Sequence, residues 1–136
     1  KKNVLESDLS LKDQPELASQ IRYYAILADF GLCRILEENE DEIVGSYGSP
    51  MYMSPECLSG LSYGLKNDLY SLGIVLYEMI FDRVPYNCSS AEELLGLIHN
   101  QGPVFEAGDN CRVPQSVKNL ILRLTDPDPS TRISHE

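Results

Sequence analysis

An aspartate at the end of a short apolar run is the first residue whose position suggests chemistry. Asp29 follows the run 23–28 and is followed by Phe30 and Gly31. Such a run, bounded by polar residues, predicts a buried strand. A carboxylate fixed at a strand end can hold a hard cation such as Mg²⁺, and Gly31 lets the chain turn away. On these residues alone, an ordinary strand followed by a turn remains the alternative.

A second stretch, Gly48–Glu56, reads Gly-Ser-Pro-Met-Tyr-Met-Ser-Pro-Glu. It precedes a segment, Lys66–Arg83, that contains Asp-Leu-Tyr-Ser-Leu-Gly at 68–73. The apolar residues of that segment recur at helical spacing; they are Leu69, Leu72, Leu76, Met79 and Ile80. Ile74 and Val75 extend the apolar surface around the helix, so we expect a central helix that is buried nearly all round.

These three motifs, in this order, resemble the C-terminal half of a eukaryotic protein kinase domain, with Ser54 where the family's small-Pro-Glu motif has Ala. The amino-acid sequence of residues 48–53 is similar to that of the ULK/Atg-type autophagy-initiating kinases. The resemblance implies a Ser/Thr kinase that transfers the γ-phosphoryl group of ATP to protein hydroxyls, with Mg²⁺ as a second cofactor.

The resemblance also assigns a nucleotide edge. It places Asn3 and Asp29 on Mg²⁺, and Leu5 and Ala28 beside the nucleotide. It also implies that Phe30 packs inward and sets the active or inactive state. Without the later motifs, residues 3–5 would be only the start of a strand.

The same resemblance locates the catalytic aspartate outside the given sequence. In the family this residue lies five positions before the asparagine that matches Asn3, so here it would precede Lys1. The chain is therefore expected to hold no catalytic base and to be inactive alone.

Residues 32–49 resemble the activation loop, and 48–56 the substrate-docking loop. The acidic residues of 37–42 suit a solvated segment, or one that recruits basic substrates. We hypothesise that Ser46 is the phosphosite. Within the docking loop the resemblance singles out Ser49, Pro50 and Tyr52, and the Ser49–Met53 wording favours Ser/Thr substrates over Tyr.

Three further residues are expected to be structural. The resemblance pairs Glu56 with a buried arginine near the end of the domain, which is Arg132 here. Asp68 should accept hydrogen bonds from the backbone of the catalytic loop; a helix-capping role is the alternative.

The composition disfavours two classes of binding partner, nucleic acids and membranes. The formal net charge of −10 disfavours nucleic-acid and membrane-surface binding, which need a basic face. No apolar run reaches the roughly 20 residues that span a bilayer, so no membrane insertion is expected. The four cysteines show no paired or zinc-type spacing, which indicates a reducing intracellular, cytoplasmic location.

The expected fold is mainly α-helical with a small β-hairpin at the nucleotide edge: the C-terminal lobe of the kinase fold, without the N-terminal lobe. Residues 1–136 would form one partial kinase domain, and 6–24 an inserted surface loop. Ser90–Glu93 is a capping box that opens a helix, which Gly102-Pro103 ends. A helix after Pro114 should bury Val117, Leu120, Ile121 and Leu124 and stop at Asp126–Pro129. The alternative function is a non-catalytic, pseudokinase-like or truncated interaction module.

Overall fold

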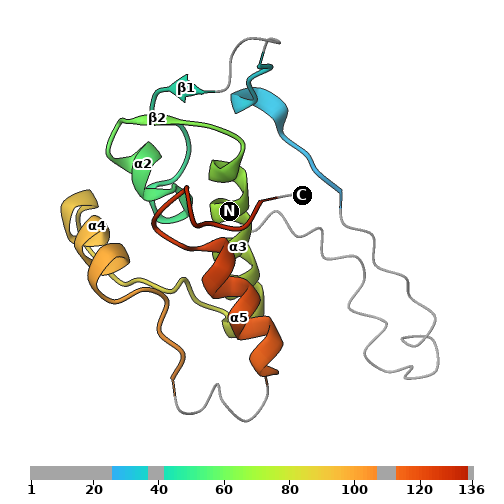
Figure 1. The fold of residues 1–136 in the computed structure, drawn as a ribbon, viewed down its shortest axis with the longest axis vertical. Coiled ribbons are helices and arrows are strands. Elements are labelled where there is room, and N and C mark those ends of the chain that lie inside the picture. The colour runs from blue at the N-terminus through green and yellow to red at the C-terminus, as the bar shows by residue number, and fades with distance from the viewer. Residues whose placement is uncertain (1–25, 37–41, 107–112, 135–136) are drawn as a thin grey trace, which may run out of the picture. The chain divides into compact units, whose positions relative to one another are not determined.

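The computed structural model describes residues 26–36, 42–106 and 113–134. The chain divides into two parts, residues 1–31 and 32–136, and each is considered by itself. Its described elements are mostly helical, with one two-stranded sheet, which confirms the predicted fold class (Figure 1).

The start of the chain carries predictions that fall outside the described residues. They include the inserted loop at 6–24 and the nucleotide-edge roles of Asn3 and Leu5. Lys1, before which the catalytic aspartate is expected, is also outside the described residues. The structure tests none of these assignments, and each stays a prediction.

The sheet is antiparallel but does not lie where the sequence placed it. Strand β1, Ile43–Val44, pairs with β2, Ser62–Tyr63, with Ile43 opposite Tyr63. The predicted strand at 23–28 is wrong in its described part: residues 26–28 form no strand, and Ile26 is 84% exposed. A strand needs a partner for its backbone groups, and no described residue pairs with this run.

Helix α3, Lys66–Phe81, carries most of the packing. Its buried residues recur at helical spacing, and they are Tyr70, Gly73, Ile74 and Tyr77. The helix ends at Asp82, which adopts a left-handed conformation (φ 55°) and donates its N–H to the carbonyl of Glu78 at 2.8 Å. Such a residue closes a helix by satisfying a carbonyl of the last turn.

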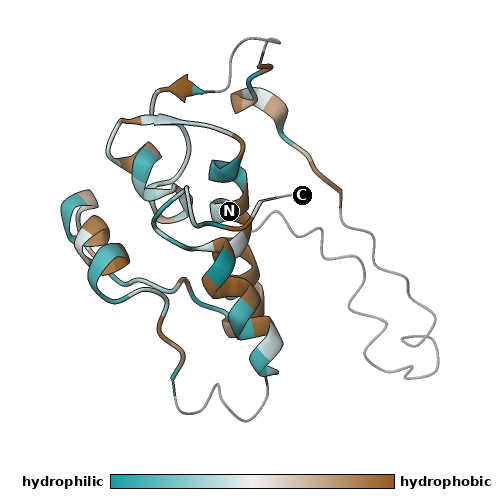
Figure 2. Cartoon of the chain, viewed as in Figure 1, coloured by the Kyte–Doolittle hydropathy of each residue, from teal (hydrophilic) through white to brown (hydrophobic). Residues whose placement is uncertain are grey.

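The prediction that α3 is buried nearly all round is wrong. Leu72 is 54% exposed and Met79 is 80% exposed, and Val75 is exposed as well. Apolar residues run along much of this helix (Figure 2). The described elements that contact α3, chiefly α5 and the η3 turn, leave these three side chains exposed. We call Leu72, Val75 and Met79 the exposed α3 stripe.

Helix α5, Gln115–Leu124, lies beside α3 (Figure 1). The two helices approach closely at Gly73, where an added Cβ would lie 2.7 Å from Thr125 Cγ2 and 2.8 Å from Leu124 Cβ. Ile121 and Leu124 are buried as predicted, but Leu120 is 41% exposed. Lys118 is buried in its place, with its ammonium 5.5 Å from the centre of the Phe105 ring. The aliphatic stem of a lysine can pack like an apolar side chain.

Helix α4, Ala91–Asn100, completes the main core through Leu94 and Ile98, which pack with Tyr70, Ile74 and Tyr86. The Ser90 hydroxyl accepts the N–H of Glu93 at 3.1 Å, as the capping box predicts. The return bond is shifted by one residue, because the Glu93 carboxylate accepts the N–H of Ser89 at 2.9 Å. This bond and a second one from the Ser89 hydroxyl lower the pKa of Glu93.

Candidate functional site

The candidate docking loop begins with a single 3₁₀ turn, η3 (Pro50–Tyr52). Ser49 precedes it in an extended conformation, and Pro50 occupies its first position, where a missing N–H costs nothing. The N–H of Tyr52 donates to the Ser49 carbonyl at 3.0 Å, and the N–H of Met53 donates to the Pro50 carbonyl at 3.1 Å. The turn leaves Ser49 exposed.

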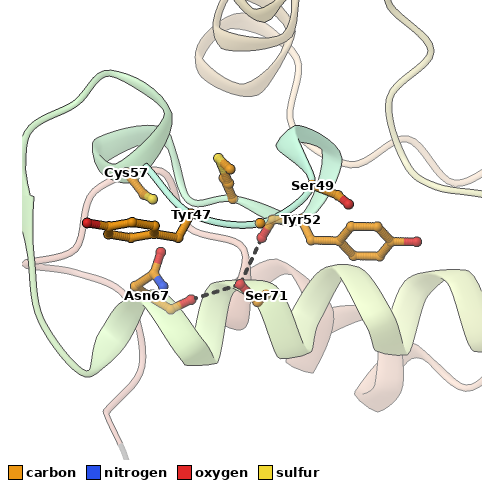
Figure 3. Close-up of a pocket in the computed structure, with 8 residues that line it drawn as sticks. Tyr47, Ser49, Tyr52, Cys57, Asn67 and Ser71 are labelled. Carbon is orange, nitrogen blue, oxygen red and sulfur yellow. Dashed lines mark hydrogen bonds between the residues drawn. The ribbon is translucent and has the colours of Figure 1, made fainter. Parts of the chain in front are cut away.

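Three side-chain hydrogen bonds fix this turn and the residues after it to α3. The Ser71 hydroxyl donates to the Tyr52 carbonyl at 2.8 Å (Figure 3). The Tyr52 hydroxyl donates to Glu78 at 2.7 Å, and that bond raises the pKa of Tyr52. The Ser54 hydroxyl donates to the side-chain oxygen of Asn67 at 2.8 Å. The backbone position of the loop is therefore set by α3.

A pocket of about 130 Å³ opens between this loop and the start of α3. Its walls come from the docking loop, helix α2 (Pro55–Leu58) and α3. The lining residues are Tyr47, Gly48, Ser49, Tyr52, Met53, Cys57, Asn67 and Ser71. Figure 3 shows the Tyr47 ring between Cys57 and Asn67, with its hydroxyl pointing away from Ser49. A pocket of this size holds part of a side chain and is too small for a nucleotide.

The pair predicted between Glu56 and Arg132 is present and buried. Arg132 donates to the two carboxylate oxygens of Glu56 at 2.6 and 2.9 Å. Its remaining N–H groups reach the carbonyls of Asp126, Lys66 and Pro127. Burial alone would raise the pKa of the Glu56 carboxyl, but the hydrogen bonds and charge of Arg132 outweigh burial and hold the pKa below its usual value.

Lys66 completes this pair in a way that the sequence did not indicate. Its ammonium donates to the carbonyls of Pro129 at 2.6 Å and Arg132 at 2.9 Å. The Arg132 guanidinium in turn donates to the Lys66 carbonyl at 3.0 Å. We call this reciprocal arrangement, together with Glu56, the clasp. It joins the start of α2, the start of α3 and the segment after α5.

The residues assigned to the nucleotide edge belong to the other part of the chain. Asp29 adopts a left-handed conformation (φ 65°), and it is exposed, as is Ala28. Phe30 is 65% exposed, and the expectation that it packs inward stays a prediction. It begins the short 3₁₀ helix η2, Phe30–Leu32, none of whose residues is buried. An exposed carboxylate such as Asp29 is a chemically suitable Mg²⁺ ligand, since Mg²⁺ in kinases takes one or two protein carboxylates and completes its shell with phosphates and water.

Two other assigned residues are found on the surface. Asp68 is exposed in the first turn of α3 and is not its N-cap, which is Leu65. The capping alternative is therefore not what the structure shows. Ser46 is exposed, and its hydroxyl donates to the sulfur of Met53 at 3.4 Å.

Sequence reasoning missed the α3 side chains that hold the loop. Asn67, Ser71 and Glu78 are polar residues at spacings of four and seven on a largely apolar helix. Residues three, four and seven apart share a helix face, so this polar row was visible as a pattern. Its partner was not, because nothing in the sequence places Tyr52 against that face.

A lobe built on one apolar helix, a docking turn fixed to that helix, and a buried Glu–Arg pair define the class of protein kinase domains. The chain belongs to that family, since the protein kinase domain matches residues 9–136. Among the described residues, no helix is long and apolar enough to cross a membrane.

Its relatives include the serine/threonine-protein kinase apg-1 of Neurospora crassa, which is 42% identical over 81% of this chain. Another is the serine/threonine-protein kinase ULK3 of Xenopus laevis, 35% identical over 98% of this chain, and ULK3 of Homo sapiens is 34% identical over 96%. The resemblance to Ser/Thr kinases of the ULK/Atg type is confirmed. The chain spans 11% of the length of apg-1 and 28% of the Xenopus protein.

Proposed function

We propose that this chain is the substrate-presenting part of a Ser/Thr protein kinase, which transfers the γ-phosphoryl group of ATP to a protein hydroxyl. The observation that carries the proposal is the docking turn. Ser71 fixes its backbone to α3, Glu78 holds the Tyr52 side chain, and the turn stands next to a pocket of side-chain size. A rigid loop that positions a hydroxyl is what phosphoryl transfer asks of a protein.

Mg²⁺, when bound, would neutralise charge on the transferring phosphoryl group. In the proposal Asp29 and Asn3 hold that ion, and Leu5 and Ala28 line the nucleotide. The docking turn, with Ser49, Pro50 and Tyr52, presents the peptide. In the proposal, the carboxylate that accepts the hydroxyl proton is the one that the family places five positions before the asparagine matching Asn3.

The test is a matched pair of substitutions in the parent kinase. Asp29 and Asp82 are both exposed and both left-handed, with φ of 65° and 55°. Asparagine tolerates that conformation, so each Asp→Asn change removes charge without adding strain. We expect Asp29→Asn to lower the rate of radiolabelled phosphate transfer to a generic basic protein by about 100-fold or more. Asp82→Asn should leave it unchanged, and equal effects of the two would refute the role of Asp29.

A second function, a non-catalytic interaction module, is favoured by the exposed α3 stripe. An exposed apolar surface of this kind is typical of association sites. Phosphate transfer by the parent protein distinguishes the two functions. A parent protein that transfers no phosphate but still binds a partner through its helical lobe would be a non-catalytic interaction module. We further propose a cytoplasmic location, since the reaction consumes intracellular ATP, and no nucleic-acid partner, since the net charge is −10.

A further inference from the structure

The docking turn has a second attachment, which runs through the side chain of Met51. Met51 is the middle residue of η3, and its half-buried side chain packs against the main core. The Cys88 thiol, in the segment between α3 and α4, donates to Met51 Sδ across 3.9 Å. The hydrogen bonds from Ser71 and to Glu78 are made by Tyr52. Met51 therefore makes a separate contact between the turn and the rest of the lobe.

The three methionines of the chain differ in their exposure. Met53 is 7% exposed, whereas Met79, in the exposed α3 stripe, is 80% exposed. Met51 lies between these extremes, since it is half-buried and packs against the main core. A small oxidant can therefore reach Met51, and a change in its side chain would disturb packing. Oxidation of Met79 would change a side chain that stands mostly in solvent.

Of the two sulfur atoms in contact, the Met51 thioether is the one suited to oxidation. A thiol is oxidised through its thiolate. Burial and the negative charge of Glu93 raise the pKa of the Cys88 thiol, so this thiol stays protonated at neutral pH. A thioether has no proton to lose, and its sulfur lone pair is available at any pH.

We propose that Met51 is an oxidation site, at which a peroxide converts the thioether to a sulfoxide and releases the docking turn from Cys88. The sulfur lone pair attacks one oxygen of hydrogen peroxide, an S–O bond forms and the O–O bond breaks. The hydroxide that leaves takes the proton of the transferred oxygen and becomes water. The sulfur loses two electrons and the peroxide gains them. Methionine sulfoxide reductases reverse the change.

The sulfoxide disturbs both contacts of Met51. It is a polar, chiral group in the place of a flexible apolar one, and burying a polar group without a partner is unfavourable. An oxygen on the lone pair that accepts the Cys88 thiol would also separate two sulfur atoms that are now 3.9 Å apart. Poorer presentation of substrate by the oxidised parent kinase is a consequence that rests on the proposed function. The loosening of the turn does not rest on it.

The experiment treats the 136-residue chain with hydrogen peroxide and locates the sulfoxides by peptide mass spectrometry. Hydrogen exchange at the amides of Tyr52 and Met53, which donate within the turn, reports how often the turn opens. We expect oxidation to make exchange at both amides roughly fivefold faster. Methionine sulfoxide reductases should restore the original rate. A thiol reductant alone should not, because it reverses the first oxidation products of cysteine and not methionine sulfoxide.

Matched variants assign the effect to one residue. Met51→Leu nearly conserves the volume of the side chain, and it should abolish the response to peroxide. Met79→Leu should keep the response, although it removes the most exposed methionine. Cys88→Ala should keep it as well, because the thiol is not the group that is oxidised. Each variant is compared with itself before treatment, so a change in its resting stability does not affect the result.

Several results would overturn the proposal. One is a Met51 that stays unoxidised while Met79 is fully oxidised, and another is a Met51 sulfoxide that leaves exchange unchanged. A response that persists in Met51→Leu, or that Cys88→Ala removes, would do the same. Rescue of the parent chain by the reductases needs no substitution, so it tests the proposal even where a variant folds poorly. None of these measurements uses phosphate transfer, so a failure of the proposed function would be seen separately in the Asp29 test.

Discussion

At the scale of single residues, Arg132 shows how a buried charge is made tolerable. Its five N–H groups all have partners, and its guanidinium lies 5.1 Å from the centre of the Tyr70 ring. A buried ion pair rarely stabilises a protein more than well-packed apolar residues would, but losing one partner leaves an uncompensated charge. Glu56 and Arg132 therefore depend on each other.

Replacing Glu56 by Gln should lower the free energy of unfolding by about 3–5 kcal/mol at pH 7. The folded-state pKa of Glu56 lies below the ordinary value of 4.5. Its contribution is therefore fully present above pH 4.5 and is lost as the pH falls through the lower folded-state pKa. Urea unfolding across this range should show the two proteins converging in acid. A difference that stays constant with pH would contradict the assignment, and Glu42→Gln, at an exposed site, is the control.

A second residue-scale prediction concerns the contact between α3 and α5. Gly73→Ala should lower the free energy of unfolding by about 1–3 kcal/mol, because the new Cβ would overlap Leu124 and Thr125. Gly96→Ala is the matched control, since it lies within α4 and has nothing within 4 Å. At that position the higher helix propensity of alanine should raise the free energy of unfolding by up to about 1 kcal/mol. Thermal unfolding of both proteins measures the contrast, and shifts of the same sign would refute the close approach.

At the scale of elements, α3 acts as the support on which the docking turn is mounted. The turn has little structure of its own, since η3 spans three residues and buries none of them. Its order comes from Ser71 and Glu78 on one helix face. A change on that face should therefore alter the loop without changing any residue of the loop itself.

Ser71→Ala should loosen the docking turn while leaving α3 intact. The Tyr52 carbonyl loses its 2.8 Å hydrogen bond, a change of about 1 kcal/mol. Hydrogen exchange should become roughly fivefold faster at the amides of Tyr52 and Met53 and stay unchanged within α3. Ser116→Ala, at an exposed position in α5, is the control. Faster exchange throughout α3 would mean that Ser71 supports the helix and not the turn.

Much of the element order could be predicted because it depends on local patterns. The start of α3, the Ser90 cap of α4 and the stop at Asp126–Pro129 all follow from periodicity, capping and proline. The run 23–28 and the burial of α3 could not be predicted in the same way. Both depend on which surface another element covers, and a pattern of apolar residues states only that a surface is apolar. The sequence placed Glu56 with Arg132 through family resemblance, whereas Lys66 in the clasp and Met51 beside Cys88 required coordinates.

At the scale of the whole molecule, an apolar stripe coexists with a strongly acidic composition. Exposed apolar surface promotes association, while a net charge of −10 opposes it through repulsion. The balance should depend on ionic strength, because salt screens the repulsion and leaves the apolar attraction in place.

Met79→Gln should reduce self-association of the 136-residue chain at high salt. Met79 is 80% exposed, so the change should have little effect on the free energy of unfolding. Sedimentation velocity at low and high salt, with the parent chain alongside, gives the measurement. Leu122→Gln is the control, since Leu122 is exposed on α5, outside the exposed α3 stripe. If the two variants behave alike, the stripe is not the site of association.

The clasp also bears on how the chain is made. Glu56 and Arg132 are separated by 76 residues, which a ribosome adds in roughly 4–15 s. Throughout that interval the Glu56 carboxylate lacks the Arg132 guanidinium, and burying the carboxylate without it would be unfavourable. The helical lobe should therefore not close segment by segment as it emerges. Its final closure should wait for the arginine, and a nascent chain stalled before residue 132 should remain sensitive to proteases that no longer cut it once Arg132 has left the ribosomal tunnel.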